Sequence, residues 1–365
     1  MPSKRKSRQQ EKKRSVYLWL LPTAILVLLG CIAYWNSADV PFVFDDLMSV
    51  QRNQGVRLGD YLHNFTPAVY FSTRSILMAT FAVNDWVDGQ NVLGYHILNL
   101  ILHILNGILI FAIAVRIFRK TGIDETTVHS YALMAAAFFL VHPVQTESVT
   151  YISSRSELLS TFFYMLGCLF YILTPESKVG FLTSLGVLAF LLLGFGAKET
   201  VITLPAAILL YDYFFITKCK LRAILTRWRF YLTFAITAAA SSYYLLAEQV
   251  VALGATGKTL PRWYYFLTQQ RVILRYIRLI LLPTGLNLDY DFQPSGSIRD
   301  VAVPLAFLVF LGVIIVGWKW RSTKPIFSFS IFWFFITLSP TSSIIPISDV
   351  IFEHRLYLPL AGVCL

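Results

Sequence analysis

Long apolar runs alternate with short polar connections along almost the whole chain. Nine of these runs are long enough to cross roughly 30 Å of hydrocarbon as helices, and a tenth begins near residue 356. This pattern predicts an all-α, polytopic membrane protein with about 10 or more transmembrane helices. The predicted spans cover residues 16–36, 93–117, 129–146, 157–173, 179–197, 200–217, 229–247, 302–319 and 326–346.

Basic residues orient the predicted spans. The first fifteen residues carry seven Lys or Arg and one Glu, so the positive-inside rule puts residues 1–15 in the cytoplasm. Orientation and attraction to membrane lipids account for the net charge of +11, and we predict no nucleic-acid partner. Residues 16–365 form the predicted membrane domain, and its longest outer segments are residues 37–92 and 248–301.

Both long outer segments are predicted to hold helices that lie on the membrane. In the first, Asn84-Asp85 and Asp88-Gly89 are turn signals next to short helices. In the second, the apolar stretch 264–282 includes three arginines on one helical face. Because burying three charges in lipid is costly, we expect an interfacial amphipathic helix there and not a span. The arginines are Arg271, Arg275 and Arg278.

The last apolar run is short. It holds only about ten apolar residues before Leu365, which is too few to cross a bilayer. The sequence is therefore predicted to be truncated, with any following domain missing.

An acidic pair distinguishes the first outer segment. Asp45 and Asp46 lie in Val-Pro-Phe-Val-Phe-Asp-Asp, shortly after the first apolar run. A carboxylate at the wet edge of a membrane can act as a general base where a lipid-carried substrate meets a water-soluble acceptor. One of the two could be the base while the other orients an acceptor or a cation. The alternative is that both only end a helix or solvate a loop.

Two ionisable residues follow the third apolar run. Pro143 ends that run and redirects the chain, and His142 and Glu147 flank the turn. Both types of side chain can bind a metal, but no second histidine stands at ligand spacing. We therefore predict no metal site and keep hydrogen-bonded structural roles as the alternative.

Cations at the same membrane level could bind a phosphate group. Lys198-Glu199 joins two apolar spans in a tight turn, and it is either a self-contained ion pair or a site where Lys198 meets phosphate. Arg155 and Arg355 are candidate guanidinium partners, since guanidinium binds phosphate oxygens in pairs. The last outer turn concentrates three charged or titratable candidates: Glu353, His354 and Arg355.

The first outer segment and the second span add polar candidates. Arg74 and His96 lie near the outer surface and are kept as site residues. Asn99, His103 and Asn106 follow His96 at steps of three or four residues, so all four share one helix face. We expect this stripe to form hydrogen bonds inside the bundle.

Seven motifs, taken in order, resemble one known family. Each is weak alone, but together they are in register with the predicted topology. They resemble the membrane half of the transmembrane and tetratricopeptide-repeat O-mannosyltransferases and their bacterial relatives. The motifs are Val-Pro-Phe-Val-Phe-Asp-Asp, the Arg74 region, Gly-Tyr-His-Ile-Leu-Asn-Leu-Ile-Leu-His-Ile-Leu-Asn, His-Pro-Val-Gln-Thr-Glu-Ser-Val-Thr-Tyr-Ile, Ala-Lys-Glu-Thr, Leu-Asn-Leu-Asp-Tyr-Asp-Phe and Phe-Glu-His-Arg-Leu-Tyr-Leu-Pro.

The resemblance implies a GT-C glycosyltransferase fold with a catalytic acid in the first outer loop. It implies a polyprenyl- or dolichyl-phosphate sugar as donor, mannose being the first guess, and Ser or Thr hydroxyls of exported proteins as acceptors. By position, Asp45 or Asp46 matches the acidic motif, and Lys198 and Arg355 match charged positions expected near the donor phosphate. The sequence departs from relatives at Arg74-Ser75, where Arg-Pro is common, and lacks their repeat array.

The predicted reaction is an inverting sugar transfer on the outer face of a multi-pass membrane protein. No cofactor is predicted, although divalent metals occur in the superfamily at large. A flippase or transporter of lipid-linked sugars, or a membrane scaffold for a missing repeat domain, is the alternative. Clustering of charge at one face, without an internal repeat, argues against transport. The nearer likeness to bacterial-type relatives favours a bacterial inner membrane over the endoplasmic reticulum.

Overall fold

The computed structural model describes residues 2–63, 74–233, 235–236, 260–347 and 349–365, and all regular structure in these ranges is helical. Short 3-10 and π turns connect the α-helices. The α-helices are α1 (Pro2–Tyr34), α2 (Leu58–His63), α4 (Ser75–Asp88), α5 (Val92–Arg119), α6 (Glu125–Val141), α7 (Thr146–Thr150), α8 (Arg155–Leu173), α9 (Phe181–Phe195), α10 (Leu204–Tyr211), α11 (Leu221–Ile224), α13 (Arg262–Leu281), α14 (Ala302–Lys319), α15 (Pro325–Leu338) and α16 (Tyr357–Val363).

Several of these segments are long and apolar enough to cross a membrane. Five qualify among the described residues, and a sixth does so if α6 and the bent segment after it form one span. The helices α9 and α15 are apolar but shorter than the spans predicted there, and most of predicted span 229–247 lies outside the described residues. The chain is thus all-α and polytopic, while ten or more spans is not confirmed. The five segments are Val16–Ser37, Val92–Arg119, Ile152–Leu173, Glu199–Ile216 and Ala302–Lys319.

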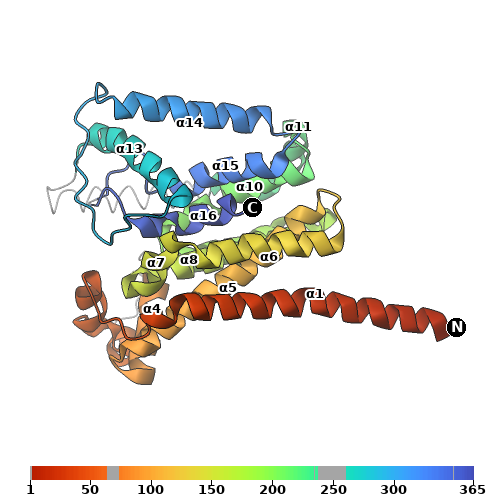
Figure 1. Cartoon of the computed structure of the whole chain (residues 1–365), viewed down its shortest axis with the longest axis horizontal. Coiled ribbons are helices and arrows are strands. Elements are labelled where there is room, and N and C mark those ends of the chain that lie inside the picture. The colour runs from red at the N-terminus through yellow and green to blue at the C-terminus, as the bar shows by residue number, and fades with distance from the viewer. Residues whose placement is uncertain (1, 64–73, 234, 237–259, 348) are drawn as a thin grey trace.

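The long helices form one bundle with two distinct ends. In Figure 1, α1, α5, α6 and α8 run roughly parallel, α10 and α15 lie beyond them, and α14 lies on the side opposite α1. Helix α5 packs against both α6 and α8, and α15 packs against α16. The N-terminus is at one end, whereas α4 and α7 are at the other. The polar turns that the sequence predicted to be outer gather at that second end.

Two local breaks follow from particular residues. The chain bends by 52° between α6 and the segment that begins at Pro143, as the proline predicted. The turn predicted at Asn84-Asp85 is wrong, because α4 continues through it to Asp88. Leu77 and Phe81 bury one face of α4 against Tyr95, which outweighs the local turn preference of Asn84-Asp85. The helix stops at Gly89, whose φ of 59° costs glycine little.

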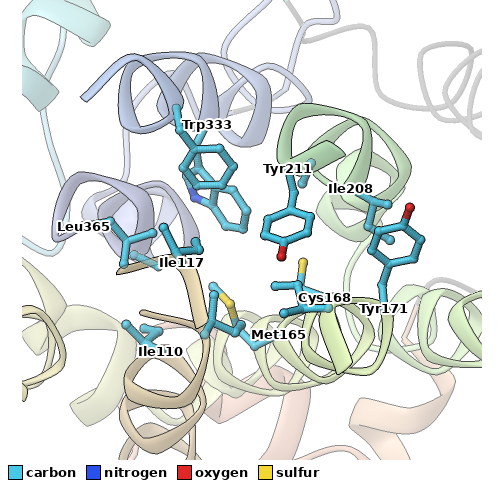
Figure 2. Close-up of a pocket in the computed structure, with 14 residues that line it drawn as sticks. Ile110, Ile117, Met165, Cys168, Tyr171, Ile208, Tyr211, Trp333 and Leu365 are labelled. Atoms are coloured by element: carbon cyan, nitrogen blue, oxygen red, sulfur yellow. The ribbon is translucent and has the colours of Figure 1, made fainter. Parts of the chain in front are cut away.

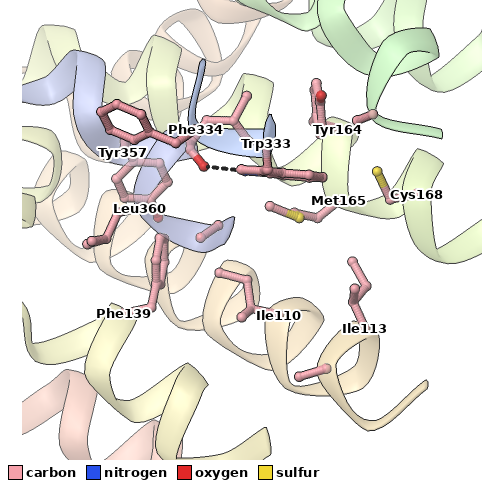
Figure 3. Close-up of a cluster of buried hydrophobic side chains, with 14 of the residues drawn as sticks. Ile110, Ile113, Phe139, Tyr164, Met165, Cys168, Trp333, Phe334, Tyr357 and Leu360 are labelled. Atoms are coloured by element: carbon pink, nitrogen blue, oxygen red, sulfur yellow. Dashed lines mark hydrogen bonds between the residues drawn. The ribbon is translucent and has the colours of Figure 1, made fainter. Parts of the chain in front are cut away.

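Close aromatic packing holds the middle of the bundle together. Figure 3 shows Trp333 of α15 lying over Met165 and beside α16, where its Nε1 donates a hydrogen bond to the Leu358 carbonyl at 3.1 Å. A Cβ on Gly362 would stand 2.1 Å from the Trp333 ring, so only glycine permits this approach of α16 to α15. The indole N–H is satisfied by the neighbouring helix while its ring fills the core.

The polar stripe on α5 forms hydrogen bonds inside the bundle, as predicted. His103 Nδ1 lies 2.8 Å from the Tyr357 hydroxyl, and Asn106 Nδ2 donates to the same hydroxyl at 3.1 Å. The other His103 ring nitrogen lies 3.0 Å from the Leu140 carbonyl, and Asn106 also donates to the Leu158 carbonyl at 2.9 Å. One buried stripe thereby ties α5 to α6, α8 and α16.

A second cluster of buried polar side chains lies at the end of the bundle away from α4 and α7. Asp212, which is fully buried, accepts hydrogen bonds from Arg227, Tyr171 and Tyr231. The Arg227 to Asp212 distance is 3.0 Å. A buried carboxylate is tolerated here because a guanidinium and two hydroxyls surround it.

The predicted amphipathic helix is present as α13, and its arginines contact the chain that follows it. Arg271 donates to the Ser295 hydroxyl at 3.0 Å, and Arg278 donates to the Thr284 hydroxyl at 2.8 Å. Arg275 lies over the Tyr290 ring, 4.9 Å from its centroid. The charged face of α13 therefore binds segment 284–295 of the same chain.

Replacing Tyr357 by Phe tests the α5 stripe. Loss of the hydroxyl leaves the buried His103 Nδ1 without its partner and removes one of the two hydrogen bonds of Asn106 Nδ2, so we expect the free energy of unfolding to fall by about 1 kcal/mol. Thermal unfolding of the purified chain in one detergent measures the change. Tyr131→Phe is the control, since Tyr131 is 52% exposed and should tolerate the change. Equal stability of both variants would contradict the assignment.

Candidate active site

A polar cavity of about 190 Å³ lies at the end of the bundle that carries α4 and α7. Segments from the whole chain meet in it: the first predicted outer loop, the start of α4, the turn before α8, the turn before α10 and the last predicted outer turn. Its wall combines acids, cations and hydroxyls. The polar residues that line it include Asp45, Ser49, Arg74, Tyr151, Ser153, Ser154, Ser156, Lys198, Glu199, Thr341, Asp349, His354 and Arg355.

A second pocket shows what a purely structural cavity looks like in this bundle. It lies between α5, α8, α10 and α15, holds about 20 Å³, and is lined mainly by apolar side chains such as Met165, Ile208 and Trp333. Figure 2 shows these side chains converging from the surrounding helices. Such a lining provides no set of groups for acid, base or anion chemistry, so the polar cavity is the candidate site.

The acidic pair separates into two environments. Asp46 is 1% exposed, and its carboxylate accepts hydrogen bonds from the Ser153 backbone N–H at 2.7 Å and the Ser153 hydroxyl at 2.6 Å. Burial raises the pKa of Asp46, and these hydrogen bonds oppose the rise. Asp45 is exposed in the cavity, and within the described residues its carboxylate makes no hydrogen bond. The Asp45 carboxylate can therefore contact a ligand in the cavity, whereas the Asp46 carboxylate stabilises the turn through Ser153.

The backbone around the pair is fixed from three sides. Phe44 has a φ of 47°, a left-handed conformation that costs a non-glycine residue about 1–2 kcal/mol. The Asp45 backbone N–H donates to the Tyr151 hydroxyl at 3.0 Å, and His96 Nε2 lies 2.8 Å from the Val40 carbonyl. His96 thus contacts the loop from α5 and does not line the cavity.

Lys198 has a partner other than the one considered from the sequence. Its Nζ lies 2.5 Å from Glu157 Oε1 of α8, and the two side chains are 13% and 3% exposed. Glu199 does not form the self-contained pair and lines the cavity separately. The Lys198–Glu157 pair is close to neutral as a unit, which weakens Lys198 as an isolated cation.

Two arginines line the cavity, and neither forms an ion pair among the described residues. Arg355 donates to the backbone carbonyls of Asp349 at 2.6 Å and Val350 at 3.2 Å. Carbonyl oxygens orient the guanidinium without cancelling its charge. Arg74 lies exposed at the start of α4 and also lines the cavity.

Arg155 lies outside the cavity lining, although the sequence made it a phosphate candidate. It is 0% exposed, donates to Asn99 Oδ1 at 2.8 Å and to the Tyr95 carbonyl at 3.2 Å, and lies over the Phe81 ring. Its guanidinium therefore connects α8 to α5 and α4. The charged Arg155 side chain therefore packs and forms hydrogen bonds inside the core.

The last outer turn is anchored by two buried carboxylates that do not line the cavity. Glu147 accepts from the His354 backbone N–H at 3.0 Å and lies 2.5 Å from His354 Nδ1. Glu353 is 2% exposed and accepts from the Asn287 N–H at 2.7 Å and from the Tyr290 hydroxyl. Burial raises the pKa of Glu353, and the Tyr290 hydrogen bond opposes this.

His142 is a structural group in the described chain. Its Nε2 lies 3.0 Å from the Ile280 carbonyl at the end of α13, and its Nδ1 accepts from the Val144 N–H at 3.2 Å. Among the described residues, no group of three or more His, Cys, Asp or Glu side chains is arranged to hold a metal ion.

Some cavity residues carry no sequence signal of their own. Tyr151 and Ser153 fall in the His-Pro-Val-Gln-Thr-Glu motif region but read as ordinary loop residues. Asp349 lies near the charged last turn and could have been chosen by position. Glu157 does not line the cavity, and it affects the cavity through its pair with Lys198, which is 41 residues away.

Comparison with curated proteins finds relatives that share one name. Over 93% of its length, the chain is 26% identical to a Caenorhabditis elegans protein named protein O-mannosyl-transferase F38B6.6. It is 33% identical over 48% of its length to Drosophila melanogaster protein O-mannosyl-transferase Tmtc1, and 29% identical over 52% to human protein O-mannosyl-transferase TMTC1. The chain resembles the protein O-mannosyltransferases. The resemblance predicted from the seven motifs is thereby confirmed.

The chain spans about half the length of the worm relative and 21% and 23% of the fly and human proteins. No family model and no solved structure matches it.

Alanine substitutions should separate the two aspartates by stability. Asp46→Ala leaves the Ser153 N–H and hydroxyl without their acceptor, so we expect a loss of about 1–3 kcal/mol in unfolding free energy. Asp45→Ala should change stability by less than about 0.5 kcal/mol, since its carboxylate is exposed. Thermal unfolding and limited proteolysis in one detergent compare the variants. An equal loss for both would refute the division of roles.

The buried Glu353 carboxylate should make stability depend on pH. Because its folded pKa is raised, its favourable contribution is complete below the unfolded value near 4.5 and is lost as pH rises through the folded pKa. As pH rises above 4.5, the native chain should therefore lose stability relative to Glu353→Gln. Unfolding curves of both proteins over this range give the difference, and a flat difference contradicts the expectation.

Proposed function

We propose that residues 16–365 form the catalytic membrane domain of a glycosyltransferase that moves mannose from a polyprenyl- or dolichyl-phosphate donor to Ser or Thr hydroxyls of proteins. One observation carries the proposal: the Asp45 carboxylate shares a polar cavity with Arg74 and Arg355, and none of the three forms an ion pair among the described residues. The shared name of the curated relatives supports mannose and a protein acceptor. The GT-C type of fold is part of the same proposal.

Asp45 is the proposed general base. The acceptor oxygen attacks the anomeric carbon, the bond from that carbon to the phosphate oxygen breaks, and the hydroxyl proton passes to the Asp45 carboxylate. The configuration at the anomeric carbon inverts because a single displacement occurs. Asp46 serves as a positioning residue: its bonds to Ser153 fix the turn that presents Asp45.

Arg355 and Arg74 are the proposed phosphate ligands. The leaving prenyl phosphate gains negative charge in the transition state, so cations already oriented in the cavity lower its energy more than that of the ground state. Carbonyls of Asp349 and Val350 hold Arg355 in place beforehand. Lys198 is the weaker third candidate, because Glu157 offsets its charge.

The cavity is proposed to face the side of the membrane opposite the basic tail. Residues 1–15 then lie in the cytoplasm, and acceptor proteins reach Asp45 after export. The three curated relatives described above come from animals. They give no reason to prefer a bacterial inner membrane over the endoplasmic reticulum, and that preference stays a prediction.

A flippase has less support. Transport needs polar groups along a path through the membrane, whereas the polar cavity lies at one end of the bundle, and the pocket between α5, α8, α10 and α15 is mainly apolar. Buried carboxylates near the cavity are engaged by neighbours, as Glu147 and Glu157 show.

Substitution of Asp45 by Asn tests the proposal. Membrane vesicles with the expressed protein receive radiolabelled polyprenyl-phosphate mannose and exported acceptor proteins, and label in protein is counted. We expect Asp45→Asn to lower transfer by about 10²–10⁴-fold, the usual worth of a general base. Asp39→Asn is the matched control, because Asp39 is an exposed acid of the same loop outside the cavity lining. Undiminished transfer by Asp45→Asn would remove Asp45 from the mechanism.

A further inference from the structure

His354 is held in the cavity wall with one ring nitrogen occupied and the other open. Glu147 of α7 binds it twice, through the His354 backbone N–H and through Nδ1. Burial raises the pKa of Glu147 to about 7, and above that pH its ionised carboxylate only accepts hydrogen bonds, so Nδ1 then carries the hydrogen in this contact. In a neutral ring, Nε2 then presents a lone pair. Within the described residues, Nε2 makes no hydrogen bond.

The surroundings keep this ring neutral. Burial is the largest cause that moves the pKa of His354 well below its ordinary value, and the charges of Lys198, Arg355 and Arg74 act in the same direction. Glu157 opposes them and offsets the charge of Lys198, with which it is paired. A lowered pKa makes the imidazole a poor proton acceptor in catalysis, while the bare nitrogen of the neutral ring can still accept a hydrogen bond.

The ring orientation is also fixed. Phe352 stacks on His354 with 4.8 Å between ring centroids and 23° between planes. Stacking on one side and the Glu147 bond at Nδ1 leave little freedom about the side-chain torsions. A preorganised acceptor of this kind discriminates between ligands that can and cannot donate to it.

The position of His354 selects its ligand. In a prenyl-phosphate sugar, a single oxygen separates phosphorus from the anomeric carbon, so the sugar must lie directly beside the phosphate site. His354 precedes Arg355, the proposed phosphate ligand, and both line the same cavity. The group that meets His354 Nε2 is therefore expected to be a sugar hydroxyl, which can donate a hydrogen bond.

We propose that His354 Nε2 accepts a hydrogen bond from one hydroxyl of the donor sugar, making His354 a specificity-determining residue and Glu147 its positioning residue. This inference rests on the proposed function. It identifies the donor class as a pyranosyl phosphate that carries a hydroxyl at the recognised position, and it predicts discrimination against the corresponding deoxy sugar.

Single-deoxy donors test the contact directly. Polyprenyl-phosphate mannose and its 2-, 3-, 4- and 6-deoxy analogues are supplied to vesicles with the native protein or with His354→Phe, and kcat/KM is measured. The native protein should lose about 10- to 100-fold with one deoxy donor, since a buried acceptor is left unpaired. His354→Phe should lose a similar factor with mannose and show no further loss with that donor.

Two further variants separate recognition from structure. His354→Gln keeps an amide oxygen that can accept, so it should recover part of the lost factor. Glu147→Gln no longer fixes the tautomer and should show an intermediate loss confined to the same deoxy position. His129→Phe is the control, because His129 is a buried histidine outside the cavity lining and should leave sugar discrimination unchanged.

Dissociation constants for the same donors, measured on purified protein, keep the outcomes distinct. If each deoxy donor lowers kcat/KM of His354→Phe by the same factor as it lowers that of the native protein, the two losses are additive. That result overturns the inference and leaves the proposed function intact. Absence of mannose transfer by the native protein refutes the proposed function instead. In that case the dissociation constants decide about the His354 contact. The contact is supported if one deoxy donor binds the native protein more weakly than the mannose donor does but shows no further weakening in His354→Phe, and it is refuted if the two effects add. Unfolding temperatures identify any variant that fails to fold.

Discussion

Ionisable groups buried in this apolar bundle must be neutralised or hydrogen-bonded, and that constraint organises the polar end of the molecule. A carboxylate left alone in such surroundings would cost several kcal/mol. Asp46 is therefore bound by Ser153, Glu157 by Lys198, Glu147 by His354 and Glu353 by Asn287 and Tyr290. Against this background, Asp45 is informative because it is an exposed acid in the cavity that needs no internal partner.

The same pairs determine which segments meet. Asp46 and Ser153 are 107 residues apart, and Glu147 and His354 are 207 residues apart. Each pair joins turns that belong to different parts of the bundle, so the paired acids fix the cavity wall as well as their own charge. The residues proposed to act on substrate are those whose side chains do not pair with a buried acid in this way. Arg155 shows the converse: its guanidinium could bind phosphate, but it donates hydrogen bonds to Asn99 and to the Tyr95 carbonyl inside the bundle.

Periodicity and composition were sufficient to predict the helical membrane class and the general course of the long helices. Apolar run length gave α5 closely, and the spacing of His103 and Asn106 predicted a buried polar stripe. The local turn signal at Asn84-Asp85 gave a wrong prediction because packing outweighed it. Helix α4 continues through these residues, which lets Leu77 and Phe81 pack in the core. The predicted count of ten or more spans is not confirmed, partly because α9 and α15 are shorter than their apolar runs.

Side-chain partners were beyond the reach of sequence patterns for a physical reason. Adjacent residues such as Asp45 and Asp46 look equivalent in one dimension, and only the position of Ser153 distinguishes them. Lys198 beside Glu199 suggested a local pair, yet the preferred acceptor came from α8. The sequence identified part of the cavity wall, whereas the roles depended on contacts between distant segments. The predicted site residues that line the cavity are Asp45, Arg74, Lys198, Glu199, His354 and Arg355.

The Glu147–His354 contact also has a consequence for how the protein is made. Ribosomes synthesise the segment containing His354 and Arg355 more than two hundred residues after Glu147, so helices from the first half of the chain enter the membrane before the wall of the cavity exists. Until then, Glu147 lacks its imidazole partner and Asp45 faces an incomplete chamber. On the proposed function, a nascent chain that lacks this turn also lacks His354 and Arg355, so its donor site is incomplete until the turn is made.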